Sequence, residues 1–399
     1  MMSSRHELLA GCVAASLLIS GCGSSDNGSD AAASAPVAPS GTKATLALLE
    51  TTDLHTNVMS YDYFKLAEDT SLGFERTATL IAQARKEFPN TLLLDNGDTI
   101  QGTALSDYQA TVNPIACSET LAIYKVMNAA GYEGGGIGNH EFNFGLPYLS
   151  QVTGNRFSIE GMAEPSAQPV CKGPSFPQVL ANVYSVKSGK PLFQPYTIIN
   201  KTVTGTGPDG KAVTGTVKVG IIGFTPPTIL SWDKRWLDGK VFTIGVKEAA
   251  EIYIPEMRAK GADLVVVISH GGLDNSGYSP TMENGSYYLS QVAGVDAMLI
   301  GHSHQIFPNA TSTVSAPSIV FRTSVSFRAL PCTGVTPGAF GIEPILLDNV
   351  VTESPDSINC FTISSPIPAD APITAIFIFN SFISMVFEYS RSCQHCILQ

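Results

Sequence analysis

The sequence predicts an α/β fold on three observations. Apolar runs of strand length alternate with helical patterns from Ala44 onward, which is typical of a sheet whose strands are linked by helices. The strand-length runs are continuously apolar, and this indicates strands that are buried on both faces. Polar residues, mainly Asp, Asn and His, close these runs. Because ligands bind at the carboxyl ends of strands in open α/β sheets, the endings predict a single site.

The expected elements follow in a regular order. A strand pattern at 45–55 is followed by a helical pattern at 75–88 and a second strand pattern at 91–98. Pro255 lies inside a later helical pattern and predicts that the helix is kinked or begins anew there. The later runs are YKVMNAAGY (124–132), VGIIGFT (219–225), KEAAEIYIPEMRAKG (247–261), DLVVVISH (263–270) and AMLIGHSHQIF (297–307).

The charge balance limits the class of substrate. The 399 residues include 34 acidic and 23 basic side chains, a formal net charge of −11, and 44% are hydrophobic, enough for a sizeable core. Proteins that bind a polyanionic backbone do so through many Lys and Arg contacts, so no polymeric nucleic acid is expected as a partner. A nucleic-acid-related substrate should be small, because metal ions can bind one phosphate inside an acidic protein.

The N-terminus has the pattern of an export signal. Arg5 precedes an apolar stretch from Leu8 to Ile19 and small residues up to Cys22, a stretch too short for a spanning helix. Residues 18–22 resemble the lipobox of bacterial lipoproteins, which implies a signal peptide at 1–21, acylation of Cys22 and a flexible linker at 22–43. We expect export to the periplasm or cell envelope and a lipid anchor in the membrane; an ordinary cleaved signal is the alternative.

An oxidising compartment also permits disulfides. Cys117 and Cys171 are candidates to pair there, although the sequence alone does not establish the pair. Cys393 and Cys396 look like half of a metal site, but no second pair stands at a suitable spacing.

Histidines gather at the predicted strand ends. Five of the seven histidines lie there, and His302 and His304 are two positions apart, a spacing that points side chains to one face of a strand. Each motif alone is compatible with a turn, a cap or a polar strand end. Together they predict a metal site. In chain order the motifs are Asp53-x-His55, Gly97-Asp98-x-x-Gln101-Gly102, Gly138-Asn139-His140-Glu141, His270-Gly271-Gly272 and Gly301-His302-Ser303-His304.

This series resembles the metallophosphoesterase superfamily, the dinuclear metal phosphatases. The stretches TTDLHTNVMSYDYF, DNGDTIQGTALSDY and GNHEFNFGLPYL are similar to the 2′,3′-cyclic-nucleotide 2′-phosphodiesterase/3′-nucleotidase branch of the 5′-nucleotidase family. The resemblance extends from about Ala44 to about Asn309. It implies a four-layer α-β-β-α sandwich.

The resemblance also implies a centre of two divalent metal ions, such as Zn, Mn, Fe or Co. The residue types agree with this chemistry, because a bridging carboxylate offers two oxygens and imidazoles suit borderline metals. Asn139 would bind a metal without adding negative charge that repels a phosphate. The implied ligands are Asp53, His55, Asp98 and His304 for one ion, and Asp98, Asn139, His270 and His302 for the other.

His140 follows a predicted ligand and is the candidate catalytic residue. It is placed to protonate the leaving alkoxide or to stabilise its charge. The 5′-nucleotidase branch has Asp three residues later, where this chain has Asn143. That difference favours the cyclic phosphodiesterase branch and leaves open what orients the ring. We expect other residues to orient the ligands and His140 without binding the metals themselves. The candidates for this role are Asn57, Gln101 and Asn143.

The character of the sequence changes near residue 310. We therefore expect the catalytic domain at 44–310 and an atypical tail at 311–399. The family's C-terminal nucleotide-binding domain is expected to be missing from this tail. A frameshift or truncation is one explanation, and a divergent cap or assembly segment is the other.

These observations predict an enzyme. The expected reaction is hydrolysis of 2′,3′-cyclic nucleotides and 3′-nucleotides by a metal-activated hydroxide. One alternative is a 5′-nucleotidase or nucleotide-sugar hydrolase. The other is an inactive truncated surface lipoprotein that binds metal without turnover.

Overall fold

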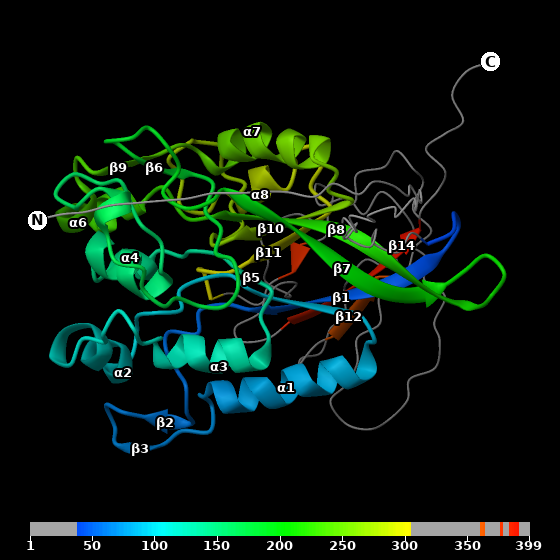
Figure 1. Ribbon diagram of the computed structural model, residues 1–399, viewed down its shortest axis with the longest axis horizontal. Helices are drawn as coiled ribbons and strands as arrows, with labels where there is room; N and C mark the ends of the chain where they lie inside the picture. The colour runs from blue at the N-terminus through cyan, green and yellow to red at the C-terminus, as the bar shows by residue number, and fades with distance from the viewer. Residues whose placement is uncertain (1–37, 305–359, 364–375, 378–382, 391–399) are drawn as a thin grey trace, which may run out of the picture. The chain divides into compact units, whose positions relative to one another are not determined.

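The computed structural model describes residues 38–304, 360–363, 376–377 and 383–390 (Figure 1). The predicted signal peptide, Cys22 and most of the linker lie outside the described residues, as do Cys393 and Cys396. Within the described ranges, no helix is long and apolar enough to cross a membrane.

Parallel strands form the first half of the main sheet. Strand β4 pairs in parallel with β1 on one side and with β5 on the other. Helices α1, α3 and α4 follow these strands along the chain and contribute apolar side chains to a common core with them. The bounds are β1 Lys43–Thr51, α1 Phe74–Glu87, β4 Thr91–Asp95, α3 Ala122–Ala130, β5 Gly134–Gly135 and α4 Leu146–Thr153.

The second half repeats this arrangement. Strand β10 pairs in parallel with β8 and with β11, and β7 forms a long antiparallel hairpin with β8. One residue pair, Lys43 with Thr206, joins β7 to β1. The bounds are β7 Tyr196–Thr206, β8 Ala212–Phe224, α7 Val246–Ala259, β10 Leu264–Ser269, α8 Ser286–Leu289 and β11 Ala297–Ile300.

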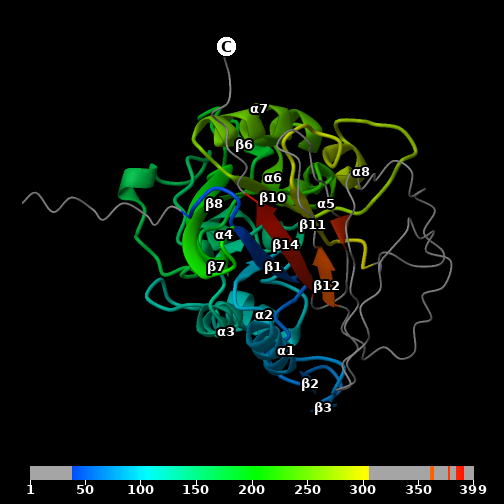
Figure 2. The ribbon, with the colours of Figure 1, turned by 90° about the vertical axis from the view of Figure 1, so that its right-hand side faces the viewer.

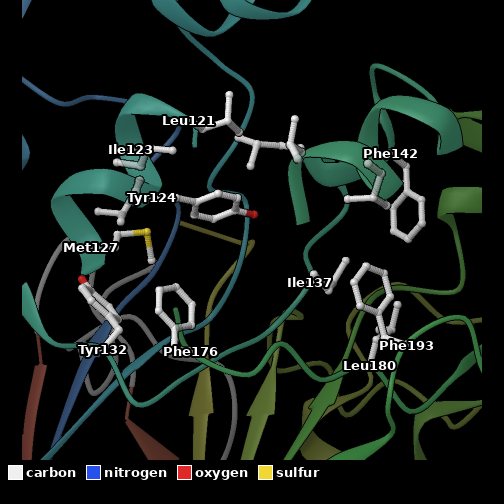
Figure 3. Close-up of a cluster of buried hydrophobic side chains, with 14 of the residues drawn as sticks. Leu121, Ile123, Tyr124, Met127, Tyr132, Ile137, Phe142, Phe176, Leu180 and Phe193 are labelled. Atoms are coloured by element: carbon white, nitrogen blue, oxygen red, sulfur yellow. The ribbon is translucent and has the colours of Figure 1, made fainter. Parts of the chain in front are cut away.

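Three hydrophobic clusters show how the two halves pack. The first lies between helices α1, α3 and α4 and one face of β1 and β4. Figure 3 shows the part of this cluster around α3, where Tyr124 and Met127 lie near Tyr132 and Phe176. The second joins the opposite face of β1 and β4 to β8, β10 and β11. The third lies between the outer face of β8, β10 and β11 and helices α7 and α8. The layers are therefore helix, sheet, sheet and helix, and the predicted four-layer sandwich is confirmed (Figure 2).

Alternation along the strands explains this arrangement. In β1, Leu46 and Leu48 face the second cluster while Ala47 and Leu49 face the first. Successive side chains of a strand point to opposite faces. A continuously apolar run therefore supplies two cores at once, which is why these strands carry no polar alternation.

Helix α7 decides one of the two alternatives predicted at Pro255. The helix runs without interruption from Val246 to Ala259 with Pro255 inside it, so it does not begin anew there. Ile254 and Met257 on either side of the proline are buried in the third cluster. Packing of this apolar face offsets the lost backbone hydrogen bond.

Strands from the predicted tail join the main sheet. β14 (Ile383–Ser390) pairs antiparallel with β1, β12 (Cys360–Ile363) pairs with β14, and β13 (Ile376–Phe377) pairs with β11. The remaining short elements are β2 Tyr61–Asp62, β3 Ala67–Glu68, α2 Ala104–Asp107, η1 Tyr108–Val112, η2 His140–Phe142, η3 Pro165–Ala167, β6 Val183–Ser185, α5 Ile229–Trp232, α6 Lys234–Leu237 and β9 Val241–Thr243. Cys117 and Cys171 form a disulfide, which confirms that predicted pair.

Candidate metal centre

The predicted site residues come together from five loops. These loops follow β1, β4, β5, β10 and β11, whose carboxyl ends meet at one edge of the two half-sheets. His302 and His304 are not on the strand itself, because β11 ends at Ile300. The loop after the strand, and not strand alternation, therefore brings both imidazoles to the site.

The first group of possible metal ligands consists of Asp53, His55 and His304. One donor atom from each lies within 4.8 Å of the others. Asp53 Oδ1 is 3.1 Å from His304 Nε2 and 3.8 Å from His55 Nε2. His55 Nδ1 donates a hydrogen bond to the Gln101 carbonyl at 2.8 Å, so Nε2 is the nitrogen left for a metal.

The second group consists of Asp98, His270 and His302, again within 4.8 Å. His270 Nε2 is 2.9 Å from Asp98 Oδ2 and 3.9 Å from Asp53 Oδ1. Asp98 also belongs to a group with His55 and His140. This position between both sets agrees with its predicted role as the bridging ligand.

Two unpaired buried atoms indicate that the site fits metal ions. Asn139 Oδ1 and His270 Nε2 have no hydrogen-bond partner among the described residues. His270 Nε2 is within ion-pair distance of Asp98 Oδ2, at 2.9 Å, so Asn139 Oδ1 is the clearer of the two indications. The Nδ1 of His270 donates to the Asn96 carbonyl at 3.1 Å. Buried polar atoms without partners are unusual in folded proteins, and a divalent ion would satisfy both.

The charges of the site favour a cation. Burial raises the pKa of the Asp53 carboxyl, but the hydrogen bond from His304 and the charge of His270 outweigh it and hold the pKa well below its usual range. Burial lowers the pKa of His270, and the carboxylates of Asp98 and Asp53 reverse this and raise it to about 10. The same carboxylates would attract a divalent ion.

The backbone of the ligand loops is strained. Positive φ is uncommon for residues other than glycine and clusters at functional sites. The predicted ligands with positive φ are Asp53 (53°), His55 (46°), Asp98 (56°), His302 (69°) and His304 (50°).

Asn143 and Asp233 orient the candidate catalytic residue. His140 Nδ1 lies 2.6 Å from Asn143 Oδ1, which can only accept, so Nδ1 carries the proton. The Asn143 amide in turn donates to both carboxylate oxygens of Asp233, at 3.2 and 3.1 Å. Nε2 of His140 lies on the side of the metal centre, 3.9 Å from Asp98 Oδ2. The sequence left open what orients the His140 ring. In the structure the Asn143 amide does so, and the buried Asp233 carboxylate holds that amide in place.

Glu141 and Glu283 also support the site, and sequence reasoning missed both. Glu141 accepts backbone N–H groups of Gly138 at 2.7 Å and Asp98 at 2.9 Å, so it ties two ligand loops together. Glu283 Oε1 is 2.8 Å from His302 Nε2. The position of Glu141 directly after His140 was a usable signal; Glu283 and Asp233 gave none.

The two other support candidates have different contacts. The carbonyl of Gln101 accepts from His55, as described above, and so holds that ring. The side chain of Asn57 donates to the Leu54 carbonyl at 3.0 Å. Asn57 therefore stabilises the turn after β1.

The sequence matches the calcineurin-like phosphoesterase family over residues 46–306. The chain belongs to the calcineurin-like phosphoesterase family. This family assignment agrees with the metallophosphoesterase fold and with the His and Asp groups that would hold divalent metals.

Individual phosphoesterases of this family are similar over most of the described chain. A 2′,3′-cyclic-nucleotide 2′-phosphodiesterase/3′-nucleotidase from Yersinia enterocolitica is 43% identical over 77% of this chain and 43% of its own length. A protein of the same name from Salmonella typhimurium is 44% identical over 66% of this chain and 37% of its own length. The chain thus spans about two fifths of the length of these relatives.

A solved phosphoesterase structure supports the same fold. The calcineurin-like phosphoesterase YfkN from Bacillus subtilis superposes with a TM-score of 0.60 at 39% identity, covering 69% of this chain and 76% of that one.

Proposed function

We propose that the protein hydrolyses 2′,3′-cyclic nucleotides and 3′-nucleotides at a centre of two divalent metal ions. The observation that carries the proposal is the convergence of two ligand groups around Asp98, beside the buried Asn139 Oδ1, which has no hydrogen-bond partner among the described residues. The names of the similar proteins from Yersinia and Salmonella support the substrate class.

Two ions would divide these ligands, and Asp98 would contribute to both. Such ions, when bound, polarise a phosphoryl oxygen and lower the pKa of water enough to supply hydroxide near neutral pH. Zn, Mn, Fe and Co suit this mixture of imidazole, amide and carboxylate. Asp53, His55, Asp98 and His304 would hold one ion, and Asp98, Asn139, His270 and His302 the other.

His140 is the proposed proton donor. Because Asn143 accepts from Nδ1, a second proton on Nε2 would point into the site, where the leaving oxygen of the substrate departs. General acid catalysis of this kind contributes about 10²- to 10⁴-fold in rate. Asp233 accepts both hydrogen bonds of the Asn143 amide and so holds the amide oxygen toward His140.

The test is hydrolysis of 2′,3′-cyclic AMP by the purified full chain after chelation and after adding Mn²⁺ or Zn²⁺. We expect turnover only with metal, and its loss in Asp98→Ala. Asp209→Ala, an exposed aspartate in the β7–β8 turn, is the matched control. Adenosine 5′-monophosphate and a nucleotide sugar are tested in parallel, since preference for either would replace the cyclic substrate. Metal binding without turnover of any of them would instead support the inactive alternative.

A further inference from the structure

Three of the predicted histidine ligands differ in the group that holds the imidazole ring. His55 and His270 each donate through Nδ1 to a backbone carbonyl, at 2.8 and 3.1 Å. His302 instead donates through Nε2 to a carboxylate, because Glu283 Oε1 lies 2.8 Å away and an ionised carboxylate can only accept. The nitrogen of His302 that is left for a metal is therefore Nδ1.

The segment that carries Glu283 is closed at its base against the ligand loop after β10. The Gly272 N–H donates to Asn284 Oδ1 at 2.8 Å, and Leu273 forms a β-bridge with Gly285. Residues 273–285 thus leave this ligand loop and return to it. The Glu283 carboxylate is therefore fixed relative to one ligand of the second group while it contacts another.

Aromatic neighbours hold the His302 ring at its faces. The Trp232 ring lies 5.6 Å from the His302 ring between centroids, with 32° between the planes, and the His270 ring lies 5.3 Å away. The His302 side chain is 13% exposed, but that of Glu283 is 44% exposed and Trp232 is 43% exposed. Two of the three side chains that hold this ligand therefore reach the protein surface.

The contact of Glu283 favours one ligand group over the other. In the first group, His55 is held by a backbone carbonyl, and His304 Nε2 lies 3.1 Å from Asp53 Oδ1. In the second group, the carboxylate of Glu283 holds His302. A carboxylate behind a metal-binding imidazole fixes its tautomer and makes it a stronger ligand, and loss of such a partner typically costs about 10- to 100-fold in metal affinity.

We propose that Glu283 is a positioning residue for the second ion and makes the two metal sites unequal. Its carboxylate would keep the proton of His302 on Nε2, leave Nδ1 for the ion and add negative charge behind this ligand. Residues 273–285 would in this way determine how fully the second site fills, while the first site keeps its ion. The proposal rests on the two-ion centre of the proposed function and not on its substrate.

Calorimetric titration of the metal-free full chain with Zn²⁺ tests the proposal. The wild type should bind two ions. Glu283→Ala should weaken one of the two binding steps about 10- to 100-fold and leave the other within about threefold. Glu283→Gln keeps an oxygen that accepts from Nε2 and should weaken the same step less. Glu68→Ala is the matched control, since it removes an exposed carboxylate of β3.

Two further measurements show that the effect passes through His302. In a His302→Ala background, which lacks the ring that Glu283 contacts, Glu283→Ala should have no further effect on either binding step. The visible absorption of bound Co²⁺ should be the same in wild type and Glu283→Ala with the first equivalent of metal. With the second equivalent it should differ, because the ligand set of that ion is changed.

The possible outcomes separate this proposal from the proposed function. Unchanged affinities in Glu283→Ala, an equal loss at both steps, or a full effect in the His302→Ala background would each overturn the role of Glu283. A wild type that binds two ions unequally, as proposed, without turnover of 2′,3′-cyclic AMP would overturn the proposed function alone. A wild type that binds no ion would overturn both.

Discussion

At the scale of single residues, Asn143 has two roles that depend on its amide. Its oxygen accepts from His140 and its nitrogen donates to Asp233, which is buried. An aspartate at this position would accept from the ring equally well but would place a second carboxylate about 3 Å from the first. With Asn143 in this position, the negative charge lies on Asp233, which is separated from the His140 ring by the neutral amide.

Exchanging the two residues tests this arrangement. Asn143→Ala should lower kcat for 2′,3′-cyclic AMP about 10- to 100-fold, with a smaller change in KM, because His140 loses its orientation. Asn143→Asp should also impair the enzyme, and the double variant Asn143→Asp with Asp233→Asn should recover most of the loss. The measurement is kcat and KM in metal-loaded protein, with the exposed Asp238→Asn as control. If kcat of the double variant does not exceed that of Asn143→Asp, the hydrogen-bonded chain from Asp233 through Asn143 does not orient His140.

Asp95 is a second buried carboxyl with an unusual pKa. Burial raises its pKa to about 7, although Thr51, Thr99 and the Gly97 N–H donate hydrogen bonds to it. The unfolded chain releases this proton near pH 4. The folded state consequently binds more protons than the unfolded state between about pH 4 and 7, so this group makes the protein less stable as pH rises through that window.

Asp95→Asn should remove this dependence. The amide keeps an oxygen for Gly97 and Thr99, so the fold should persist. Between pH 5 and 8 the wild type should lose on the order of 2 kcal/mol of unfolding free energy relative to Asp95→Asn. Denaturant titrations of the metal-free chains at several pH values measure the difference. Parallel pH profiles for the two chains would show that Asp95 does not titrate in this range.

At the scale of elements, short loops after the strands carry the site, and glycines let them approach one another. A Cβ at Gly138 would lie 2.2 Å from Asp98 Oδ1 and 2.6 Å from Asp98 N. No side chain fits at that distance, so the loop after β5 can contact the loop after β4 only with glycine at this position.

Gly138→Ala should therefore disturb the metal centre more than the fold. We expect Zn²⁺ or Mn²⁺ affinity to fall about 10- to 100-fold, the range for losses in the support of metal ligands. Gly271→Ala is the matched control, since it also follows a predicted ligand but its Cβ would have its nearest contact at 3.4 Å. Metal titration by calorimetry measures both variants. If the two variants bind metal equally well, Asp98 can move away from the added Cβ at position 138 without a loss of metal affinity.

At the scale of the whole molecule, two half-sheets with separate helix layers enclose one shared apolar core. Strands β13 and β14 extend this sheet next to β11 and β1. The origin of the predicted tail, by frameshift or by divergence, stays a prediction, and so does the lipid anchor on Cys22. We propose that the anchor holds the catalytic domain at a membrane through the linker at 22–43.

Cys22→Ser tests this location. In bacterial cells the wild-type chain should fractionate with membranes and label with palmitate, because acylation adds chains that partition into the bilayer. The variant should appear in the soluble exported fraction without label, and Cys12→Ser should behave as the wild type. A wild-type chain that is soluble and unlabelled would support an ordinary cleaved signal.

The sequence by itself determined the strand ends, the family and the predicted ligand set. These depend on local properties: apolar runs specify β1, β4, β10 and β11, and Asp, Asn and His directly after a strand must lie near its carboxyl end. Asp98 and His270 were therefore predictable although 172 positions separate them.

The tertiary structure alone showed which contacts the supporting side chains make and added Asp233 and Glu283 to them. Asp233 reaches Asn143 across a sequence separation of 90, and Tyr148 of α4 and Gln101 of the loop after β4 line one cavity. Such contacts depend on how two half-sheets and their helices pack, and no local period encodes that packing. The uninterrupted helix through Pro255 has the same explanation, since burial of Ile254 and Met257 in the third cluster outweighs the local preference of proline.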